Sequence, residues 1–335
     1  MTETFELEED MLRGEITRRG SRRVLIQLPE GLKGEGLRLA RVVEEAGALP
    51  IISADPCYGA CDIAIDEARR LNADLIVHYG HSELILDVDI PTIYIEARSK
   101  VQIDGAIEDS LRHLEEWGRI GLATTVQHIH RLDEARRMLN KAGKTVVVGD
   151  AGRMRYPGQV IGCEYSNALT IKDEVEAFLF LGGGRFHALG LALTTMKPVV
   201  VADPFEGRAY PIGEDEVQKV IRQRWINIAQ AREAGAFGIL VGMKIGQTNL
   251  NSALRLKRYL RECGKDAVLL ALREINAEAL REFPSIEAFV NTGCPRVSTD
   301  DLSTFEKPVL NVNEALVMLG RMRWEDLLEG RWFER

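Results

Sequence analysis

This chain has 335 residues, of which 45% are hydrophobic and 28% charged, and its formal net charge is −8. That composition is typical of a globular protein with room for two or three domains. The negative charge argues against direct binding to nucleic acid, because such binding draws most of its affinity from phosphate contacts. No apolar run approaches the roughly 20 residues that a transmembrane helix needs, so we expect no membrane association.

The N-terminus is acidic from Glu3 to Asp10, where a secretory signal would be basic and then apolar. We therefore expect a cytoplasmic protein, in which thiols stay reduced. The five cysteines are then interpreted as free thiols, metal ligands or catalytic groups before disulfides are considered.

Short, β-branched apolar runs recur along the chain in three groups. Their nearly unbroken hydrophobicity is typical of parallel strands that are buried on both faces. The first group is 24–28, 50–52, 75–77 and 92–95; the second is 120–123, 145–148, 177–180 and 198–201; the third is 237–241, 267–270, 288–290 and 308–310. Each group predicts one sheet.

Amphipathic helical stretches closed by glycine separate the first and second run of each group. They are 37–45 before Gly47, 132–141 before Gly143 and 250–262 before Gly264. A β-α-β pattern in units of about 110 residues indicates a small doubly wound domain, because such a unit is too long for a solenoid repeat. We predict an α/β fold with three similar doubly wound parallel-sheet domains arranged around a central site.

The predicted domains are residues 1–116 with Cys61, 117–220 with Cys163, and 221–335 with Cys294 and a C-terminal tail. No Pro- or Ser-rich linker separates them. We expect boundaries within 115–119 and 217–235, both helical, and close packing of the three units.

Both ends of the chain are expected to pack on these domains. Residues 1–22 predict a helical lead-in. The last stretch, 318–335, contains Trp324, Trp332 and Phe333. Because large aromatic side chains are mostly buried, we predict a helix and tail that lie over a domain, in preference to a partner-binding tail.

Three cysteines lie in glycine-containing loops after predicted strands, namely Cys61, Cys163 and Cys294. Open α/β sheets bind ligands at the carboxyl ends of their strands, so we interpret the three loops as one site. The three cysteines do not occupy fully equivalent positions in their domains, because Cys61 and Cys163 follow the second strand of their groups and Cys294 follows the third strand of its group. A single buried cysteine is more often a small core residue, and Cys263, at a predicted helix end, is interpreted as an ordinary structural or surface thiol.

The spacing of the cysteines restricts what they would bind. Structural zinc usually has four ligands in local pairs, and the one local pair here is Cys57 with Cys61. Three thiolates with an open position suit an iron–sulfur cluster. The one-loop C-x3-C-x2-C motif of radical S-adenosylmethionine enzymes begins at Cys57 but has Ala64 at its last position. Ligands of a cluster must therefore come from distant loops.

A glycine-rich loop after a predicted strand contains Gly182, Gly183 and Gly184, followed by His187. Its backbone amides could bind an anionic or zwitterionic ligand, although a tight turn explains the glycines equally well.

Further polar loops end other predicted strands. Residues 124–128 and 242–247, the latter with Gly246 and Gln247, end first strands. His78 and His81 are as consistent with hydrogen-bonded loop residues as with ligands. We reject a phosphate loop at 31–36, because Leu37 stands where lysine is required.

These motifs together resemble the diphthamide synthase family, over roughly residues 20–320. They are 55–62, 124–128, 161–163, 182–187, 246–247 and 294–296. The resemblance implies three α/β domains that each donate one cysteine to a single [4Fe-4S] cluster, in a homodimer. By motif the ligands would be Cys61, Cys163 and Cys294, while Cys57 lies close enough to compete or substitute.

The resemblance also implies an activity, the first step of diphthamide formation. S-adenosylmethionine would bind the open iron, and a reduced cluster would deliver one electron to its sulfonium. The resulting 3-amino-3-carboxypropyl radical would add to a histidine of translation elongation factor 2, releasing 5′-methylthioadenosine. An electron donor is a further implied partner, and no catalytic side chain is predicted beyond the cluster ligands. Expected contacts to S-adenosylmethionine are Gly182, Gly183, Gly184, His187, Gly246 and Gln247.

Two other hypotheses remain open on the sequence. One is a metal-binding α/β protein without catalysis, and iron–sulfur absorption of anaerobically purified protein separates it from the enzyme. The other is a Rossmann-type nucleotide-binding enzyme with incidental cysteines, which would stay active after all three were changed to serine.

Overall fold

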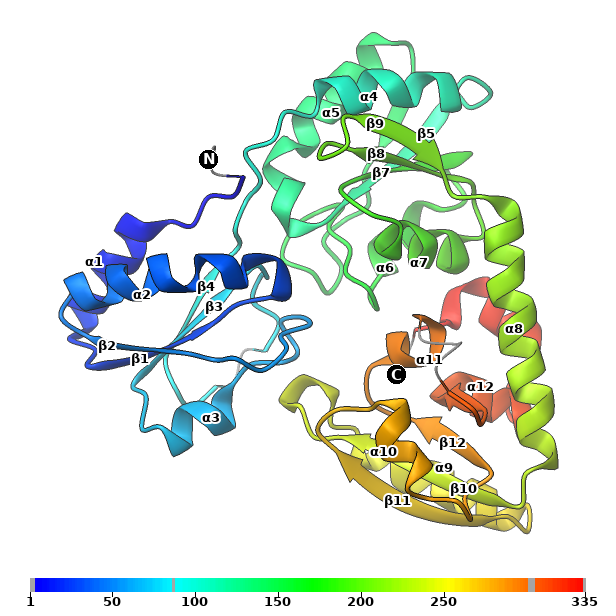
Figure 1. Ribbon diagram of the computed structural model, residues 1–335. Helices are drawn as coiled ribbons and strands as arrows, with labels where there is room; N and C mark the ends of the chain where they lie inside the picture. The colour runs from blue at the N-terminus through cyan, green and yellow to red at the C-terminus, as the bar shows by residue number, and fades with distance from the viewer. Residues whose placement is uncertain (1–3, 86–87, 301–304, 334–335) are drawn as a thin grey trace.

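The computed structural model describes residues 4–85, 88–300 and 305–333 of the chain. Three lobes form a triangle in Figure 1, with the blue N-terminal lobe at the left, the green lobe at the top and the yellow-to-red lobe at the lower right. Each lobe is built on one mainly parallel sheet. The prediction of three similar α/β domains is therefore confirmed.

The first lobe has a four-stranded sheet with strand order β2-β1-β3-β4. Its strands are β1 (Arg23–Gln27), β2 (Leu49–Ile52), β3 (Leu75–Tyr79) and β4 (Thr92–Ile95). Its helices are α1 (Glu9–Arg19), η1 (Glu30–Glu35), α2 (Gly36–Glu45) and α3 (Ile65–Arg70). The predicted helical lead-in is α1.

The second lobe has a five-stranded sheet with order β6-β5-β7-β8-β9. Its strands are β5 (Arg119–Thr124), β6 (Thr145–Val147), β7 (Ala177–Leu181), β8 (Val199–Asp203) and β9 (Arg208–Pro211). Its helical segments are α4 (Asp104–Ser110), η2 (Leu111–His113), η3 (Val126–Arg131), α5 (Leu132–Lys141), α6 (Ser166–Ile171) and α7 (Phe186–Thr195). Only β9 is antiparallel to its neighbour among these strands, and the sequence did not predict it.

The third lobe repeats the first, with strand order β11-β10-β12-β13. Its strands are β10 (Ala236–Gly242), β11 (Asp266–Leu272), β12 (Ala288–Asn291) and β13 (Val309–Asn311). Its helical segments are η4 (Ile245–Gln247), α9 (Leu250–Glu262), α10 (Ala277–Arg281), α11 (Pro295–Asp300), α12 (Val312–Met318), α13 (Trp324–Asp326) and η5 (Leu327–Arg331). Helix α8 (Glu214–Glu233) runs down the right edge of Figure 1 from the second lobe to the third.

Each sheet is covered on both faces, as a doubly wound domain requires. Successive residues of one strand enter different cores: in β7, Leu179 packs with α4 and α5, whereas Phe178 and Phe180 pack with α6 and α7. The same alternation divides β3, where Val77 and Ile76 belong to separate clusters. Because strand side chains alternate between faces, an unbroken apolar run is what a strand buried on both faces needs.

All twelve predicted strands are present, but one predicted boundary is not helical. Residues 115–118 form a turn between η2 and β5, whereas 217–235 falls largely in α8 as expected. The predicted boundary between the first and second domains, at residues 116 and 117, stays a prediction. Because α4 packs against β8 and β9, a first boundary nearer residue 100 fits the packing better.

The C-terminal tail packs on the protein through residue 333, the last that the structure describes. Trp332 is buried in the second lobe's core, where Phe333 also lies. Trp324 contacts both Trp332 and Trp225 of α8, with ring centroids 5.6 and 4.9 Å away. Up to that point, the prediction of a tail laid over a domain is confirmed.

Candidate functional site

The three predicted cysteines lie in loops that connect a strand to a helix. Cys61 lies between β2 and α3, Cys163 between β6 and α6, and Cys294 between β12 and α11. All three are half-buried and outside any disulfide, whereas Cys263 is exposed at the end of α9. Each of the three sheets therefore presents one of these predicted cysteines where ligands bind in open α/β folds.

Gly246 brings the third lobe directly against Cys61. Its N–H donates to the Cys61 carbonyl at 2.9 Å. A Cβ at position 246 would lie 2.6 Å from the Cys61 Cα, so a larger residue has no room. The next side chain, Gln247, donates from Nε2 to the Cys61 Sγ at 3.5 Å. Gly246 and Gln247, both predicted site residues, thus contact one predicted ligand.

Arg296 connects the loop of Cys294 to the second lobe, because its side chain contacts Phe186 there. Its guanidinium lies 3.9 Å from the centre of the Phe186 ring, and Nη2 donates to the Phe186 carbonyl at 3.0 Å. A Cβ on Gly162, next to Cys163, would lie 2.5 Å from that ring and 3.6 Å from the Arg296 Cγ. The loops of Cys163 and Cys294 therefore meet at the same pair of side chains.

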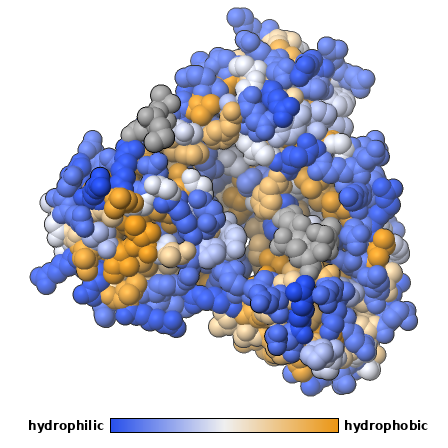
Figure 2. All heavy atoms as spheres, viewed as in Figure 1, coloured by the Kyte–Doolittle hydropathy of each residue, from blue (hydrophilic) through white to orange (hydrophobic). Residues whose placement is uncertain are grey.

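Two glycines complete the link inside the third lobe. A Cβ on Gly242 would lie 3.4 Å from the Cα of Gly293 and 3.4 Å from the Cβ of Gln247. Since Gln247 contacts Cys61 and Gly293 precedes Cys294, an unbroken series of contacts joins all three cysteine loops. The space-filling view shows a hollow where the three lobes meet (Figure 2).

The spacing of the thiols bears on what they could hold. Ligand atoms of a single ion must lie close together, and in the described part of the chain Cys57, His78 and His81 form such a group, within 4.8 Å. Cys61, Cys163 and Cys294 form no such group. Three thiols around a wider space fit a polynuclear cluster, because its metal–sulfide core would lie between them. They do not fit a single zinc ion.

A buried ion pair supports the loop that contains Cys57 and Cys61. Lys244 Nζ lies 2.7 Å from Asp62 and 2.6 Å from Glu274, and 4.4 Å from the centre of the Tyr58 ring. Burial raises the pKa of Asp62, while its hydrogen bond from Lys244 opposes that shift. Lys244 was not predicted as a site residue, although a lysine just after the end of β10 is a signal for one.

Cys57 itself is buried, with 3% of its surface exposed. Burial raises the pKa of its thiol to about 12, with Asp62 as the next contribution. A small cavity of about 130 Å³ lies beside this loop, between the first and third lobes. Its lining is polar and includes Asp55, Asp62, Lys244 and Arg273.

The glycine-rich loop between β7 and α7 makes its contacts within the second lobe. The Gly184 N–H donates to an Asp203 carboxylate oxygen at 3.1 Å. A Cβ on Gly183 would lie 2.9 Å from the Phe205 ring, and one on Gly182 would lie 3.1 Å from the Phe180 ring. Part of this loop is therefore a tight turn held by Asp203.

His187, at the start of α7, lies beside the Cys294 loop. Its ring stacks on Phe180, with centroids 5.8 Å apart and planes at 17°. Burial lowers the pKa of His187 to about 3, and the positive charge of Arg296 contributes. The imidazole is thus neutral near pH 7. The structure brings His187, Gly246 and Gln247 to the cysteine loops, whereas Gly182, Gly183 and Gly184 contact the interior of their own lobe.

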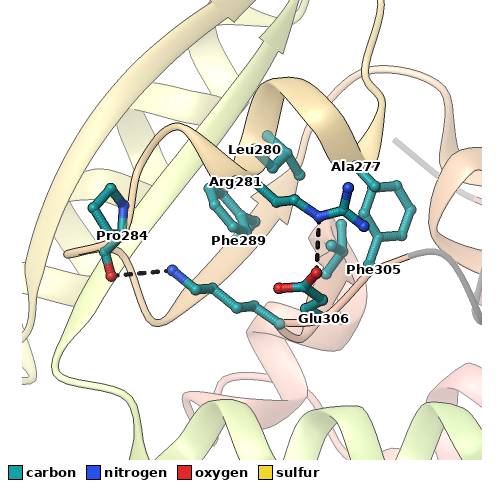
Figure 3. Close-up of a pocket in the computed structure, with 9 residues that line it drawn as sticks. Ala277, Leu280, Arg281, Pro284, Phe289, Phe305 and Glu306 are labelled. Atoms are coloured by element: carbon teal, nitrogen blue, oxygen red, sulfur yellow. Dashed lines mark hydrogen bonds and ion pairs between the residues drawn. The ribbon is translucent and has the colours of Figure 1, made fainter.

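A larger cavity, of about 340 Å³, lies in the third lobe at the amino ends of β12 and β13. Its polar groups bind one another: Arg281 binds Glu306 at 2.8 Å, as Figure 3 shows. Lys307 donates to the Pro284 carbonyl at 3.1 Å. The cysteine loops follow the carboxyl ends of their strands. This cavity is therefore separate from the candidate site.

No helix within the described residues is both long enough and apolar enough to cross a bilayer.

Comparisons with known proteins agree with this architecture. The sequence profile described as "Putative diphthamide synthesis protein" matches residues 28–328. The 2-(3-amino-3-carboxypropyl)histidine synthase of Pyrococcus horikoshii is 39% identical over 317 residues, covering 94% of this chain and 91% of that protein. Subunit 1 of the enzyme with the same name in Saccharomyces cerevisiae is 31% identical over 311 residues, covering 91% of this chain and 72% of that protein.

A solved structure has the same fold. The crystal structure of Dph2 from Pyrococcus horikoshii with 4Fe-4S cluster superposes with a TM-score of 0.87 at 38% identity, covering 95% of this chain and 92% of that one. The relatives are synthases, which are transferases. The extent of the match, together with three lobes that each present one cysteine, shows that this chain belongs to the diphthamide synthesis family.

Proposed function

We propose that this chain transfers a 3-amino-3-carboxypropyl group from S-adenosylmethionine to a histidine of translation elongation factor 2. The similar proteins are named for a product of that kind, an alkylated histidine. The observation that carries the proposal is the convergence of Cys61, Cys163 and Cys294 from three lobes, through contacts made by Gly246 and Arg296. A packing role alone does not require one thiol from each lobe.

Cys61, Cys163 and Cys294 would hold a [4Fe-4S] cluster. Three thiolates leave one iron without a protein ligand, and that position would receive S-adenosylmethionine. When bound, such a cluster supplies one electron to the sulfonium, so that the bond from sulfur to the γ-carbon breaks. The structure of Dph2 from Pyrococcus horikoshii contains a cluster of this type.

The chain's own residues would set the geometry. Gln247 donates to the Cys61 sulfur, and hydrogen bonds to ligand sulfurs influence cluster potential. Gly246 permits the close approach of the first and third lobes. The neutral His187 and the backbone of Gly183 are our proposed contacts for the zwitterionic methionine part of the substrate. The amides of Gly182 and Gly184 already donate to the Ala202 carbonyl and to Asp203, so these two glycines would shape the loop.

Iron content tests the ligand assignment. Cys61→Ser, Cys163→Ser and Cys294→Ser should each lose most of the bound iron, because a three-thiolate site has no spare ligand. Cys263→Ser, at an exposed position, is the matched control and should keep it. If Cys57→Ser removed the iron while Cys61→Ser kept it, the ligand in the first lobe would be Cys57.

Product analysis tests the reaction. Reduced protein with S-adenosylmethionine and elongation factor 2 should yield 5′-methylthioadenosine and a modified histidine. The direction of cleavage depends on how the substrate is oriented, and a misplacement of about 1 Å changes rates by roughly a hundredfold. Mainly 5′-deoxyadenosine, or equal turnover without reductant, would contradict the mechanism.

We also propose a homodimer, a cytoplasmic location and a separate electron donor. Two alternatives remain distinguishable from the proposed enzyme. A non-catalytic metal-binding protein would contain a metal without forming 5′-methylthioadenosine. A Rossmann-type nucleotide-binding enzyme would stay active after serine replaced all three cysteines.

A further inference from the structure

We propose that Cys57, His78 and His81 form a second metal site, for one divalent transition-metal ion such as Zn²⁺ or Fe²⁺. The site lies beside the loop of Cys61 but uses none of the three proposed cluster ligands. One ligand atom from each residue, a sulfur and two ring nitrogens, lies within 4.8 Å of the other two. Cys57 and His78 are buried and His81 is half-buried.

The spacing of these atoms suits a tetrahedral ion. His78 Nε2 and His81 Nδ1 are 3.0 Å apart. Two imidazole nitrogens bound to one zinc at about 2.0–2.1 Å would lie about 3.3 Å apart, and a nitrogen and a sulfur about 3.5 Å apart. Small side-chain movements would therefore bring all three atoms to bonding distance. The donor set of one sulfur and two imidazole nitrogens suits zinc and other borderline-soft ions.

The orientation of the His78 ring is determined by Gln27. The Gln27 amide group donates from Nε2 to the Asp62 carbonyl at 2.5 Å, and Oε1 accepts from the Ala64 N–H at 3.1 Å. Oε1 is thus the acceptor toward His78 Nδ1, 2.9 Å away, so Nδ1 carries the proton. The other ring nitrogen of His78, Nε2, is then unprotonated, and its lone pair points toward His81. Metal-binding histidines typically have this kind of support behind the ligand.

The sulfur of Cys57 also has support. The backbone N–H of Gly59 hydrogen-bonds to it, and the positive charge of Lys244 is close enough to act on it. Both interactions favour the thiolate, which is the form that binds metal. Burial and the negative charge of Asp62 act in the opposite direction and favour the thiol until a metal binds.

The strand order explains why Cys57 lies next to His78 and His81, although it is at least 21 positions away from them in the sequence. β1 lies between β2 and β3 in the sheet. Cys57 follows β2, Gln27 ends β1, and His78 lies in β3 with His81 just beyond it. An ion at this point would tie the loop of Cys57 and Cys61 to the end of β3. Three protein ligands would leave its fourth position for water.

Cobalt binding tests the site directly. We start from the variant with Cys61→Ser, Cys163→Ser and Cys294→Ser, which removes the other thiols of the candidate site. Adding Co²⁺ anaerobically should produce thiolate-to-cobalt absorption and the visible bands of a tetrahedral ion, with one ion per chain. Adding Cys57→Ser should remove the thiolate band. His81→Gln should weaken Co²⁺ binding by at least about tenfold, because one of three ligands is lost.

Cys263→Ser in the same background is the control and should leave the cobalt spectrum unchanged. If the thiolate band survived Cys57→Ser, or if Co²⁺ bound only when Cys61, Cys163 and Cys294 were present, the proposal would be wrong.

Metal analysis of the cluster-containing protein provides a second test that does not depend on the triple variant. Protein reconstituted with iron and sulfide and then exposed to Zn²⁺ should bind about one zinc per chain in addition to its iron. His81→Gln should lose the zinc and keep the iron. Loss of iron with retention of zinc would overturn the assignment. The result is separate from the proposed activity, because zinc binding here requires neither S-adenosylmethionine nor turnover.

Discussion

At the scale of single residues, two positions make physical demands that a substitution would expose. Gly246 lies against the backbone of Cys61, where no side chain fits. His128, in η3, is a buried imidazole whose Nδ1 has no hydrogen-bond partner among the residues that the structure describes. The first position controls how two lobes meet, and the second affects how stability depends on pH.

Gly246→Ala should destabilise the protein by about 1–3 kcal/mol, because overpacking against backbone forces the two loops apart. The new Cβ would lie 2.7 Å from the Cys61 Cβ and 2.8 Å from its carbonyl oxygen. Urea denaturation measures the change, and iron content should fall with it. Gly34→Ala is the matched control, because a Cβ at that position meets no atom of the described residues within 4 Å. Equal effects of the two changes would contradict this reading of Gly246.

Stability should fall as the pH drops from about 6.5 to about 4, in part because of His128. Burial lowers the pKa of this imidazole to about 4, whereas in the unfolded chain it is near 6.5. Between these values the unfolded state binds a proton that the folded state does not, so acid favours unfolding; above about 6.5 this contribution to stability is fully present. Denaturation at several pH values should show a shallower slope for His128→Leu.

The control for this prediction is Ile129→Val, at a partly buried position of the same segment η3, which changes packing but no titrating group. It should leave the slope as it is in the parent protein. An unchanged slope in His128→Leu would show that this imidazole does not contribute.

At the scale of elements, α8, which runs from the second lobe to the third, is attached to the third lobe by a buried arginine. Arg224 and Glu314 are both fully buried and form an ion pair. The same guanidinium donates from Nη1 to the Ser298 carbonyl at 2.5 Å and from Nη2 to the Val309 carbonyl at 2.8 Å. One side chain on α8 thus binds α11, β13 and α12. Since α11 follows Cys294 directly, this pair also supports a proposed ligand.

Arg224→Leu should cost about 3–5 kcal/mol, because it leaves the Glu314 carboxylate buried without its partner. The double variant with Glu314→Leu should be less destabilised than Arg224→Leu alone, since no unpaired charge remains. Chemical denaturation measures both. Arg136→Ala, which breaks the exposed pair with Asp133, should have little effect. A double variant that is less stable than the single one would contradict the charge argument.

At the scale of the whole molecule, the three lobes meet at one site through loops that are distant in sequence. A cluster held by Cys61, Cys163 and Cys294 would bind the folded arrangement and not the unfolded chain. The cluster-containing protein should therefore melt at a higher temperature than the metal-free protein under anaerobic conditions. Calorimetry or circular dichroism measures the difference.

Cys263→Ser should show the same increase in melting temperature when the cluster is bound. The variant with serine at all three proposed ligands and at Cys57 should show no increase on addition of iron and sulfide, because it lacks the thiols of both proposed metal sites. Equal melting temperatures of the two wild-type forms would mean that the packing of the lobes is complete without metal.

The sequence by itself determined the sheets, because the signal for a strand buried on both faces is local and strong. The twelve apolar runs all became strands, and the glycine-closed stretches became α2, α5 and α9. It did not predict β9, because Arg208–Pro211 contains no apolar run and is a strand only through its pairing with β8. The helix expected at 115–119 was wrong, since residues 115–118 form a turn and Arg119 begins β5.

The candidate site divides in the same way. Residue types and their place after strands were enough to single out the cysteine loops, Gly246, Gln247 and His187. Only the tertiary structure decided which of them touch. The contacts between Gly246 and Cys61, and between Arg296 and Phe186, join residues of different lobes. Likewise Cys57, His78 and His81 converge because β1 lies between β2 and β3, and the order of strands in a sheet depends on long-range packing that the spacing of residues along a chain does not encode.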